Sequence, residues 1–441
     1  MEKETILQKV KEAGVVGAGG AGFPAQVKIS ADADVVIANG AECEPLLSTD
    51  RFLMEQRAAE IVEGLRLIKQ TTGAKDLYIA LKAKYKKAIA VFDKILGASS
   101  DIELYKLDNY YPAGDEFELV YNITGNSIPE NGLPLDVGAV VTNVNTILNI
   151  KRAVKDSKPV TTRWVTVAGA LDEPYMAEVP VGINAGELVR RAKPSVEDYI
   201  IVGGGPMTGS VVDENYIIDK RDGGIVVLPV DNPAAIKKSR TVHSNEKRGK
   251  SMCDQCFDCS IVCPRNLLGH DLSPHIMMRN LFIAPENSSV HLTNAYLCCE
   301  CGLCDMFACP LDLSPRQMLL QAQETLQKKG VANPHNRKDL KVHPERIFRR
   351  VNTDRLVKRI GLDKYEGQKL GVKSVKTDKV KIALCQHIGA PARPLVDEGE
   401  RVTDGDLIAG IPEDTLGATV HASIDGKITK ITDNSITIAG G

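Results

Sequence analysis

Two cysteine-rich stretches, CDQCFDCSIVCP at residues 253–264 and CCECGLCDMFACP at residues 298–310, hold nine of the eleven cysteines in this chain of 441 residues. In each stretch three cysteines are spaced by two residues, and a last cysteine stands directly before a proline. Three thiolates at that spacing can surround one face of an iron–sulfur cubane, and the proline-linked cysteine points away from it. The stretches therefore predict a domain that holds two [4Fe–4S] clusters.

The last cysteine of each stretch is expected to bind the cluster of the other stretch, as it does in two-cluster ferredoxins. The two predicted ligand sets are Cys253, Cys256, Cys259 and Cys309 for one cluster, and Cys298, Cys301, Cys304 and Cys263 for the other. Cys299 could replace Cys298, but only Cys298 gives the regular spacing. We therefore expect Cys299 to be a buried neutral thiol.

Zinc and disulfides are the alternatives for these cysteines. Zinc ribbons use paired C-x2-C units rather than triplets, and they do not need the two Cys-Pro endings. Disulfides are unusual in a chain whose N-terminal segment is charged and lacks the apolar run of a secretory signal. Both alternatives are therefore disfavoured.

The length and composition indicate several packed domains and exclude some partners. The net charge is −2 and 43% of the residues are hydrophobic, so nothing global favours binding to nucleic acid or to an anionic membrane. No run of 18 apolar residues is present, so no membrane span is expected.

The first 150 residues or so alternate strands with helices, which predicts an α/β sheet. A helix is expected over residues 51–70, and strands are expected at 35–38, 77–81, 102–107 and 137–142. Polar residues follow the strands. Because open α/β sheets bind ligands at the carboxyl ends of their strands, one ligand cleft is expected there.

A glycine-rich loop, GAGGAGFP at residues 17–24, satisfies the pattern G-x-G-x-x-G. The pattern alone is weak, because a helix rather than a long strand precedes it. Its glycines leave backbone N–H groups free to approach a phosphate or a flat ring, and Lys28 could supply a positive charge. The alternative is a flexible turn.

Four motifs together resemble the flavin site of the RnfC family, which is itself similar to the flavoprotein subunit of respiratory complex I. They are the glycine loop with Lys28, NGAECEP at 39–45, YPAGDE at 111–116, and TNVNT at 142–146. The resemblance implies that NADH meets the flavin near the catalytic residues Phe23, Glu44 and Glu116. It implies FMN contacts by Gly17, Gly19, Gly20, Gly22, Lys28, Asn39, Glu42, Gly114, Asp115, Asn143 and Thr146. Ala25 and Thr142 depart from the family pattern.

Two further segments resemble known modules. Residues 159–232 are strand-rich and similar to the β-grasp (SLBB) module of that family, with a loop at 203–209 that resembles its GGPMMG loop or is a tight turn. Residues 379–441 resemble a barrel-sandwich hybrid of the biotinyl/lipoyl type. No Lys stands at the expected hairpin tip between Pro412 and Thr419, so no lipoate or biotin is expected.

The sequence thus predicts a multidomain protein of α/β and α+β modules. The expected ranges are 1–158 for the FMN- and NADH-binding α/β domain, 159–232 for the SLBB module, 244–328 for the ferredoxin-type domain, 329–378 for a helical linker and 379–441 for the barrel-sandwich hybrid. In the RnfC family the barrel precedes the flavin module, whereas here it follows the ferredoxin unit.

This order and length resemble the cobalamin reductases of propanediol-utilisation microcompartments. The resemblance implies electron transfer from NADH through FMN and the clusters to cobalamin, in the cytoplasm and inside a bacterial microcompartment. It implies as partners cobalamin or a cobalamin-handling enzyme (an adenosyltransferase) and a possible shell protein. The alternatives are an Rnf-like NADH:ferredoxin oxidoreductase component and a flavin-less electron carrier or scaffold.

Overall fold

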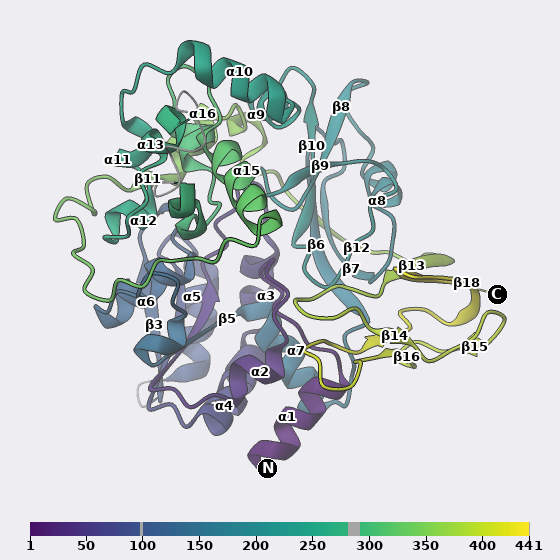
Figure 1. The fold of residues 1–441 in the computed structure, drawn as a ribbon. Helices are drawn as coiled ribbons and strands as arrows, with labels where there is room; N and C mark the ends of the chain where they lie inside the picture. The colour runs from purple at the N-terminus through teal and green to yellow at the C-terminus, as the bar shows by residue number, and fades with distance from the viewer. Residues whose placement is uncertain (98–99, 281–291, 441) are drawn as a thin grey trace.

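The computed structural model describes residues 1–97, 100–280 and 292–440, which fold into four modules (Figure 1). This agrees with the predicted combination of α/β and α+β modules. Residues 281–291 of the predicted ferredoxin-type range and residue 441 of the predicted barrel range lie outside the described residues. No helix within the described ranges combines the length and the apolar character that crossing a bilayer requires.

The first module is a parallel sheet with the spatial order β3-β2-β1-β5. Its strands are β1 (Val35–Gly40), β2 (Asp76–Lys82), β3 (Ile102–Leu107) and β5 (Ala139–Asn143). Its helices are α1 (Lys3–Glu12), α2 (Ala25–Ser30), α3 (Thr49–Gln56), α4 (Ala58–Thr72), α5 (Lys86–Leu96), α6 (Glu116–Thr124) and α7 (Val144–Lys155), with the short 3₁₀ helix η1 at Pro134–Val137. The carboxyl ends of β1 and β5 therefore lie side by side.

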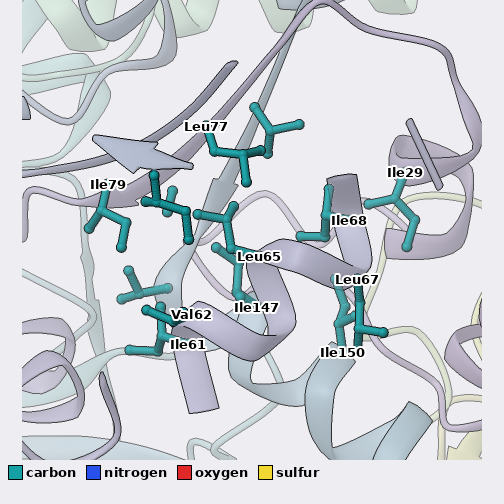
Figure 2. Packing of buried hydrophobic residues seen from close by; sticks show 14 of the residues in the cluster. Ile29, Ile61, Val62, Leu65, Leu67, Ile68, Leu77, Ile79, Ile147 and Ile150 are labelled. Carbon is teal, nitrogen blue, oxygen red and sulfur yellow. The ribbon is translucent and has the colours of Figure 1, made fainter. Parts of the chain in front are cut away.

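The core of this module lies between the sheet and the helices α4 and α7 (Figure 2). Ile61, Leu65 and Ile68 recur at helical spacing and are fully buried on one face of α4. Gly64 lets α7 approach closely, since a Cβ atom there would lie 2.5 Å from the carbonyl oxygen of Ile147.

The single helix expected over residues 51–70 is two helices, α3 and α4, that meet at Arg57. Arg57 leaves the helical region with φ −129°. The break lets α4 pack in the core while α3 turns toward the second module, where Phe52 contacts Trp164 with ring centroids 4.9 Å apart. Neither glycine nor proline marks this break, so the sequence carries no signal for it.

The second module is a mixed sheet with the spatial order β12-β7-β6-β10-β8-β9 and one helix, α8 (Ala185–Ala192). Its strands are β6 (Thr162–Gly169), β7 (Tyr175–Pro180), β8 (Tyr199–Gly203), β9 (Ser210–Val212), β10 (Gly224–Pro229) and β12 (Gly371–Ser374). The last strand comes from far along the chain and pairs in parallel with β7.

The third module is helical and carries the cysteines; in Figure 1 its helices lie over the first module and beside the second. Its helices are α9 (Pro233–Lys238), α10 (Val242–Met252), α11 (Asp258–Ile261), α12 (Pro264–Leu267), α13 (Pro274–Asn280) and α15 (Pro315–Lys328), with the short turns η3 (Thr293–Leu297) and η4 (Cys304–Ala308). Each Cys-Pro pair sits where a short helix or turn begins or ends.

Residues 329–378, expected to be a helical linker, are joined to the other modules by strand pairing. They contain α16 (Thr353–Arg359), the short 3₁₀ helix η5 (Asp363–Tyr365) and two strands, β11 (Val351–Asn352) and β12. Strand β11 pairs with β4 (Tyr110–Tyr111) of the first module, and β12 completes the second sheet. Arg346 forms a buried ion pair with Glu118 of α6. The segment therefore binds the modules together.

The C-terminal module is built from two small antiparallel sheets, β13-β19-β18-β15 and β14-β16-β17. Its strands are β13 (Lys379–Ala383), β14 (Arg393–Pro394), β15 (Arg401–Val402), β16 (Leu407–Gly410), β17 (Val420–His421), β18 (Gly426–Thr432) and β19 (Ser435–Ala439). It contacts the first two modules at several places, and at one of them Lys220 Nζ donates to the carbonyls of Gly14 (2.8 Å) and Thr419 (3.0 Å). Gly14, at φ +62°, is needed there because a Cβ atom would lie 2.4 Å from the Thr419 oxygen.

Candidate functional site

Two adjoining cavities, of about 490 and 360 Å³, lie at the carboxyl ends of β1 and β5. The residues that line both are Gly19, Asn39, Gly114, Asp115, Asn143 and Cys299. We call the larger the inner cavity, because it reaches Cys301 and the second module, and the smaller the outer cavity, because it reaches Lys28 and Phe23. Together they form the single cleft that the polar strand ends predict.

Asn39 and Asn143, each at the end of a strand, hold the floor of the cleft in place. Asn39 donates from Nδ2 to the carbonyl of Gly114 (2.8 Å) and accepts from the Ala41 amide at 3.1 Å. Asn143 caps α7 by accepting from the Asn145 amide (2.8 Å), and its Nδ2 donates to Oδ2 of Asp50 (2.7 Å). The sheet and the start of α7 thus position polar groups along the cleft.

The glycine loop is tied to the same helix. The amide of Ala18 donates to Oγ1 of Thr146 at 2.8 Å, and the Gly17 amide donates to the Phe23 carbonyl at 2.8 Å. Gly20 has φ +106°, and a Cβ atom there would meet nothing within 4 Å, so the loop is open at this residue, whereas a Cβ atom at Gly22 would lie 2.8 Å from Arg221 Cδ. The Gly22 amide is also engaged, with the Gly17 carbonyl, so within the described residues the amides of Gly19, Gly20 and Ala21 are left for a phosphate or a flat ring beside the N-terminus of α7.

Several residues expected to contact cofactor or NADH are engaged with protein groups. Lys28 Nζ pairs with Glu116 Oε1 at 2.7 Å, and both line the outer cavity with Phe23. The carboxylate of Glu44 lines the inner cavity and accepts from the amides of Met207 (2.8 Å) and Thr208 (2.9 Å). The 203–209 loop, expected as either a family loop or a tight turn, thus binds Glu44.

Asp115 also has protein partners. It caps α6 by accepting from the amides of Phe117 (3.1 Å) and Glu118 (3.2 Å). Arg265, two residues after Cys263, donates to both of its oxygens at 2.6 and 3.1 Å. The residue expected to touch FMN therefore also clamps the cysteine module to the cleft.

Glu42 and Asp50 are neighbouring acidic side chains of the cleft whose pKa values are raised. Burial, followed by the negative charge of Asp50, raises the pKa of Glu42 to about 8. Burial raises the pKa of Asp50 to about 6, against the opposing effect of Arg163. The Asp50 amide also donates to Glu42 Oε2 at 3.0 Å. Glu42 therefore holds a proton near neutral pH.

The walls of the cleft contain buried polar atoms for which the described residues provide no hydrogen-bond partner. Within the described ranges, Oγ1 of Thr142 in the outer cavity and Nη1 of Arg163 in the inner cavity are buried without a hydrogen-bond partner. Buried polar groups in proteins are almost always paired. Together with the glycine loop and Lys28, these groups fit a flavin mononucleotide, which offers phosphate, ribityl hydroxyls and ring carbonyls.

The cysteines of one predicted set lie together across the two stretches. Cys253 and Cys309 pack against the same small core of Met278, Leu313 and Met318. The charge of Cys309 also contributes, after burial, to the raised pKa values of the thiols at Cys256 and Cys259. This arrangement supports the crossed assignment, which stays a prediction.

The other set is likewise drawn from both stretches. Cys263 and Cys298 pack on one small core with Leu272 and Leu297. Burial raises the pKa of the Cys304 thiol, and the charges of Asp305, Cys298, Cys259 and Cys263 add to the increase, so thiols of both predicted sets lie near Cys304. Cys299, expected to be a buried neutral thiol, is half-buried in the cleft wall, and a side-chain hydrogen bond with Cys301 lowers its pKa.

The surroundings of these thiols fit cubane clusters. The amides of Glu300 and Leu313 donate to the sulfurs of Cys298 and Cys309, each at 3.3 Å, as hydrogen bonds to cluster ligands do. In the described part of the chain, no three His, Cys, Asp or Glu side chains converge as the ligands of a single metal ion. A cubane needs no such convergence, because each thiolate binds a different iron.

Three residues of the site were not anticipated from the sequence: Asp50, Arg163 and Arg265. Arg265 has one local signal, because a cation directly after a Cys-Pro pair is placed near the cluster ligands. Asp50 follows the NGAECEP motif but matches no part of it. Arg163 stands alone at the start of β6, and its partner Ala18 is far away in the sequence.

Three segments of the chain match known family models. Residues 10–152 match the Nuo51 FMN-binding domain, residues 252–314 match a 4Fe–4S dicluster domain, and residues 362–441 match the RnfC barrel sandwich hybrid domain. These matches confirm the predicted FMN-binding and iron–sulfur modules and the predicted fold class.

Two curated relatives are similar over the whole chain. The cobalamin reductase PduS of Citrobacter freundii is 39% identical and covers 100% of this chain and 97% of its own length. The cobalamin reductase PduS of Salmonella typhimurium (strain LT2) is 38% identical, with 100% and 98% covered.

Solved structures of an NAD+-reducing [NiFe]-hydrogenase share the fold. The H2-reduced state has a TM-score of 0.50 at 18% identity, over 77% of this chain and 69% of that chain. The air-oxidized state has the same TM-score and identity, over 84% and 68%.

Proposed function

The chain belongs to the cobalamin reductase PduS family and is a flavin and iron–sulfur electron-transfer oxidoreductase, and we propose that it carries electrons from NADH through FMN and two [4Fe–4S] clusters to a cobalamin. The observation that carries this proposal is the position of Cys299 and Cys301 in the wall of the inner cavity. The glycine loop lines the same cavity, so a flavin held there would lie beside one predicted cluster set.

Different residues of the chain are proposed to hold the phosphate end and the ring of FMN. The glycine loop, the start of α7 and Lys28 hold the phosphate end in the outer cavity, where Thr146 fixes the loop. Asn39, Gly114 and the inner cavity hold the ring. When bound, the flavin supplies the step between a two-electron hydride donor and one-electron clusters.

NADH is proposed to approach the flavin ring where the two cavities meet, from the side on which Phe23 and Glu116 line the outer cavity. The Phe23 ring offers a face on which the nicotinamide can stack, and Glu116 is held in the cavity wall by its ion pair with Lys28. Glu44, one of the three predicted catalytic residues, has a different role in this proposal: its carboxylate orders the 203–209 loop against the cleft.

The cysteine positions suggest an order of transfer. Cys301 brings one ligand set to the cleft, and Tyr111 donates from its hydroxyl to the Cys301 carbonyl at 2.7 Å. Cys256, in the other set, is exposed. We therefore assign the set of Cys263, Cys298, Cys301 and Cys304 to the flavin side, and the set of Cys253, Cys256, Cys259 and Cys309 to the acceptor side.

The name of the relatives motivates the acceptor and the setting. Cobalamin, free or presented by an adenosyltransferase, is proposed to receive the electrons near Cys256. A bacterial microcompartment in the cytoplasm is the proposed location, with a shell protein as a possible contact.

The test is an anaerobic, cofactor-reconstituted preparation mixed with NADH in a stopped-flow instrument and read at flavin and cluster wavelengths. Flavin bleaching should precede cluster bleaching, and added cob(II)alamin or cob(III)alamin should reoxidise both. Phe23→Ala should slow the first phase at subsaturating NADH while FMN stays bound. Flavin reduction without reoxidation by any cobalamin would refute the acceptor, and absence of flavin reduction would refute the donor.

A further inference from the structure

Arg163 is a buried cation in the cleft that neither the FMN-binding match at residues 10–152 nor the four motifs include. It is the second residue of the second module's strand β6 and is 3% exposed, yet it lines the inner cavity. Its side chain therefore crosses from one module into the binding cleft of another.

Two of its three nitrogens are fixed by backbone carbonyls. Nη2 donates to the carbonyl of Ala18 in the glycine loop at 2.7 Å, and Nε donates to the carbonyl of Asp222. These bonds lock the plane of the guanidinium. Nη1 is left buried and without a hydrogen-bond partner among the described residues.

The charge of Arg163 is also left without a direct counter-ion. Burial lowers the pKa of Arg163, and the charges of Asp50, Asp222, Asp219 and Glu42 oppose that decrease, but Arg163 forms no direct ion pair with a carboxylate in the described ranges. Asp50 accepts from Asn143 instead. A desolvated cation with a free N–H favours a neighbour that is an acceptor and carries negative charge.

The location separates the two ends of the nucleotide. Lys28 and Thr146 lie in the outer cavity, where the phosphate is proposed to bind, whereas Arg163 lines the inner cavity together with Cys301. The ring end of a flavin carries carbonyl acceptors, and its pyrimidine portion takes up negative charge when the ring is reduced. A positive group at that portion tunes the electronics of the ring.

We propose that Arg163 is a cofactor-binding residue supplied by the second module, and that its Nη1 donates to the pyrimidine end of the flavin and favours the reduced over the oxidised ring. The inference rests on the proposed function, because it requires FMN in this cleft. It also makes the second module part of the redox site, since the same guanidinium holds the glycine loop through Ala18.

The experiment measures FMN dissociation constants by anaerobic equilibrium dialysis of the full chain, with oxidised FMN and with dithionite-reduced FMN. The variants are Arg163→Met and Arg163→Gln, which remove the charge, and Arg163→Lys, which keeps it. The matched control is Arg221→Met, because Arg221 lines the same cavity but is already paired with Asp219 at 2.6 Å.

Loss of one charged hydrogen bond corresponds to a factor of roughly 10 to 150. Arg163→Met and Arg163→Gln should therefore lose about 10-fold to 150-fold in affinity for reduced FMN and less for oxidised FMN. A tenfold difference lowers the two-electron potential of the bound flavin by about 30 mV. Arg163→Lys should keep most of the preference, and Arg221→Met should leave it unchanged.

Equal losses for both redox states in the charge-removing variants would overturn the inference, because that result reports a structural role alone. An equal loss of preference in Arg221→Met would also overturn it. If Arg163→Met does not fold, the comparison of Arg163→Gln with Arg163→Lys decides. A parent protein that binds both redox forms equally refutes this inference alone, whereas a parent that binds no FMN refutes the proposed function.

Discussion

The ion pair between Arg265 and Asp115 clamps the cysteine module to the cleft, and its removal should loosen that interface locally. Both side chains are nearly buried, at 9% and 14% exposed, and the two N–H···O contacts are 2.6 and 3.1 Å. The guanidinium also stacks over the Phe117 ring at 3.7 Å. Arg265→Met would leave the Asp115 carboxylate buried without its cation, which costs about 3–5 kcal/mol.

A loss of that size raises the population of locally opened molecules by roughly 10²- to 10⁴-fold. Hydrogen–deuterium exchange of peptides spanning residues 111–120 and 260–268 should accelerate accordingly in Arg265→Met. Adding Asp115→Asn should reverse most of the effect, because asparagine still caps α6 but leaves no buried charge. Arg191→Met, which breaks an exposed pair with Glu187, should change exchange little. Acceleration below tenfold, or no recovery in the double variant, would refute the clamp.

Three further predictions concern the cofactors and pH. Cys309→Ser should impair the cluster of Cys253, Cys256 and Cys259. Electron paramagnetic resonance would measure this loss, with Cys263→Ser as the comparison variant. Selective loss of the other cluster in Cys309→Ser would contradict the crossed assignment. Lys28→Ala should weaken FMN binding by about 1.5–3 kcal/mol in a fluorescence titration, whereas the exposed Lys75→Ala should not; equal affinity in the two variants would remove Lys28 from the phosphate site. The pKa of Glu42 is raised to about 8 in the folded chain, whereas the unfolded chain loses this proton near pH 4.5. The protonated Glu42 therefore contributes fully to the free energy of unfolding below pH 4.5, and the contribution is lost as pH rises toward 8. Glu42→Gln should flatten that decline when urea unfolding is followed by Trp164, the single tryptophan, at pH 5, 6.5 and 8; an unchanged pH profile would show that Glu42 does not carry it.

The sequence was most informative where function restricts local spacing. The cysteine triplets and the glycine loop predict two clusters and a flavin module because their geometry is encoded within a few residues. The break at Arg57 and the strand pairing of residues 351–352 and 371–374 follow from packing between distant segments, which local patterns do not encode. Arg163 was not predicted for the same reason, since a single arginine near the start of a strand belongs to no sequence motif.

The junction of Lys220, Gly14 and Thr419 shows that the order of the modules along the chain differs from their order in space. Oγ1 of Thr419 also donates to the carbonyls of Lys11 (3.1 Å) and Glu12 (3.0 Å), so the barrel docks on the start of the flavin module although it is encoded last. The position of a module along the chain therefore does not determine which modules it contacts.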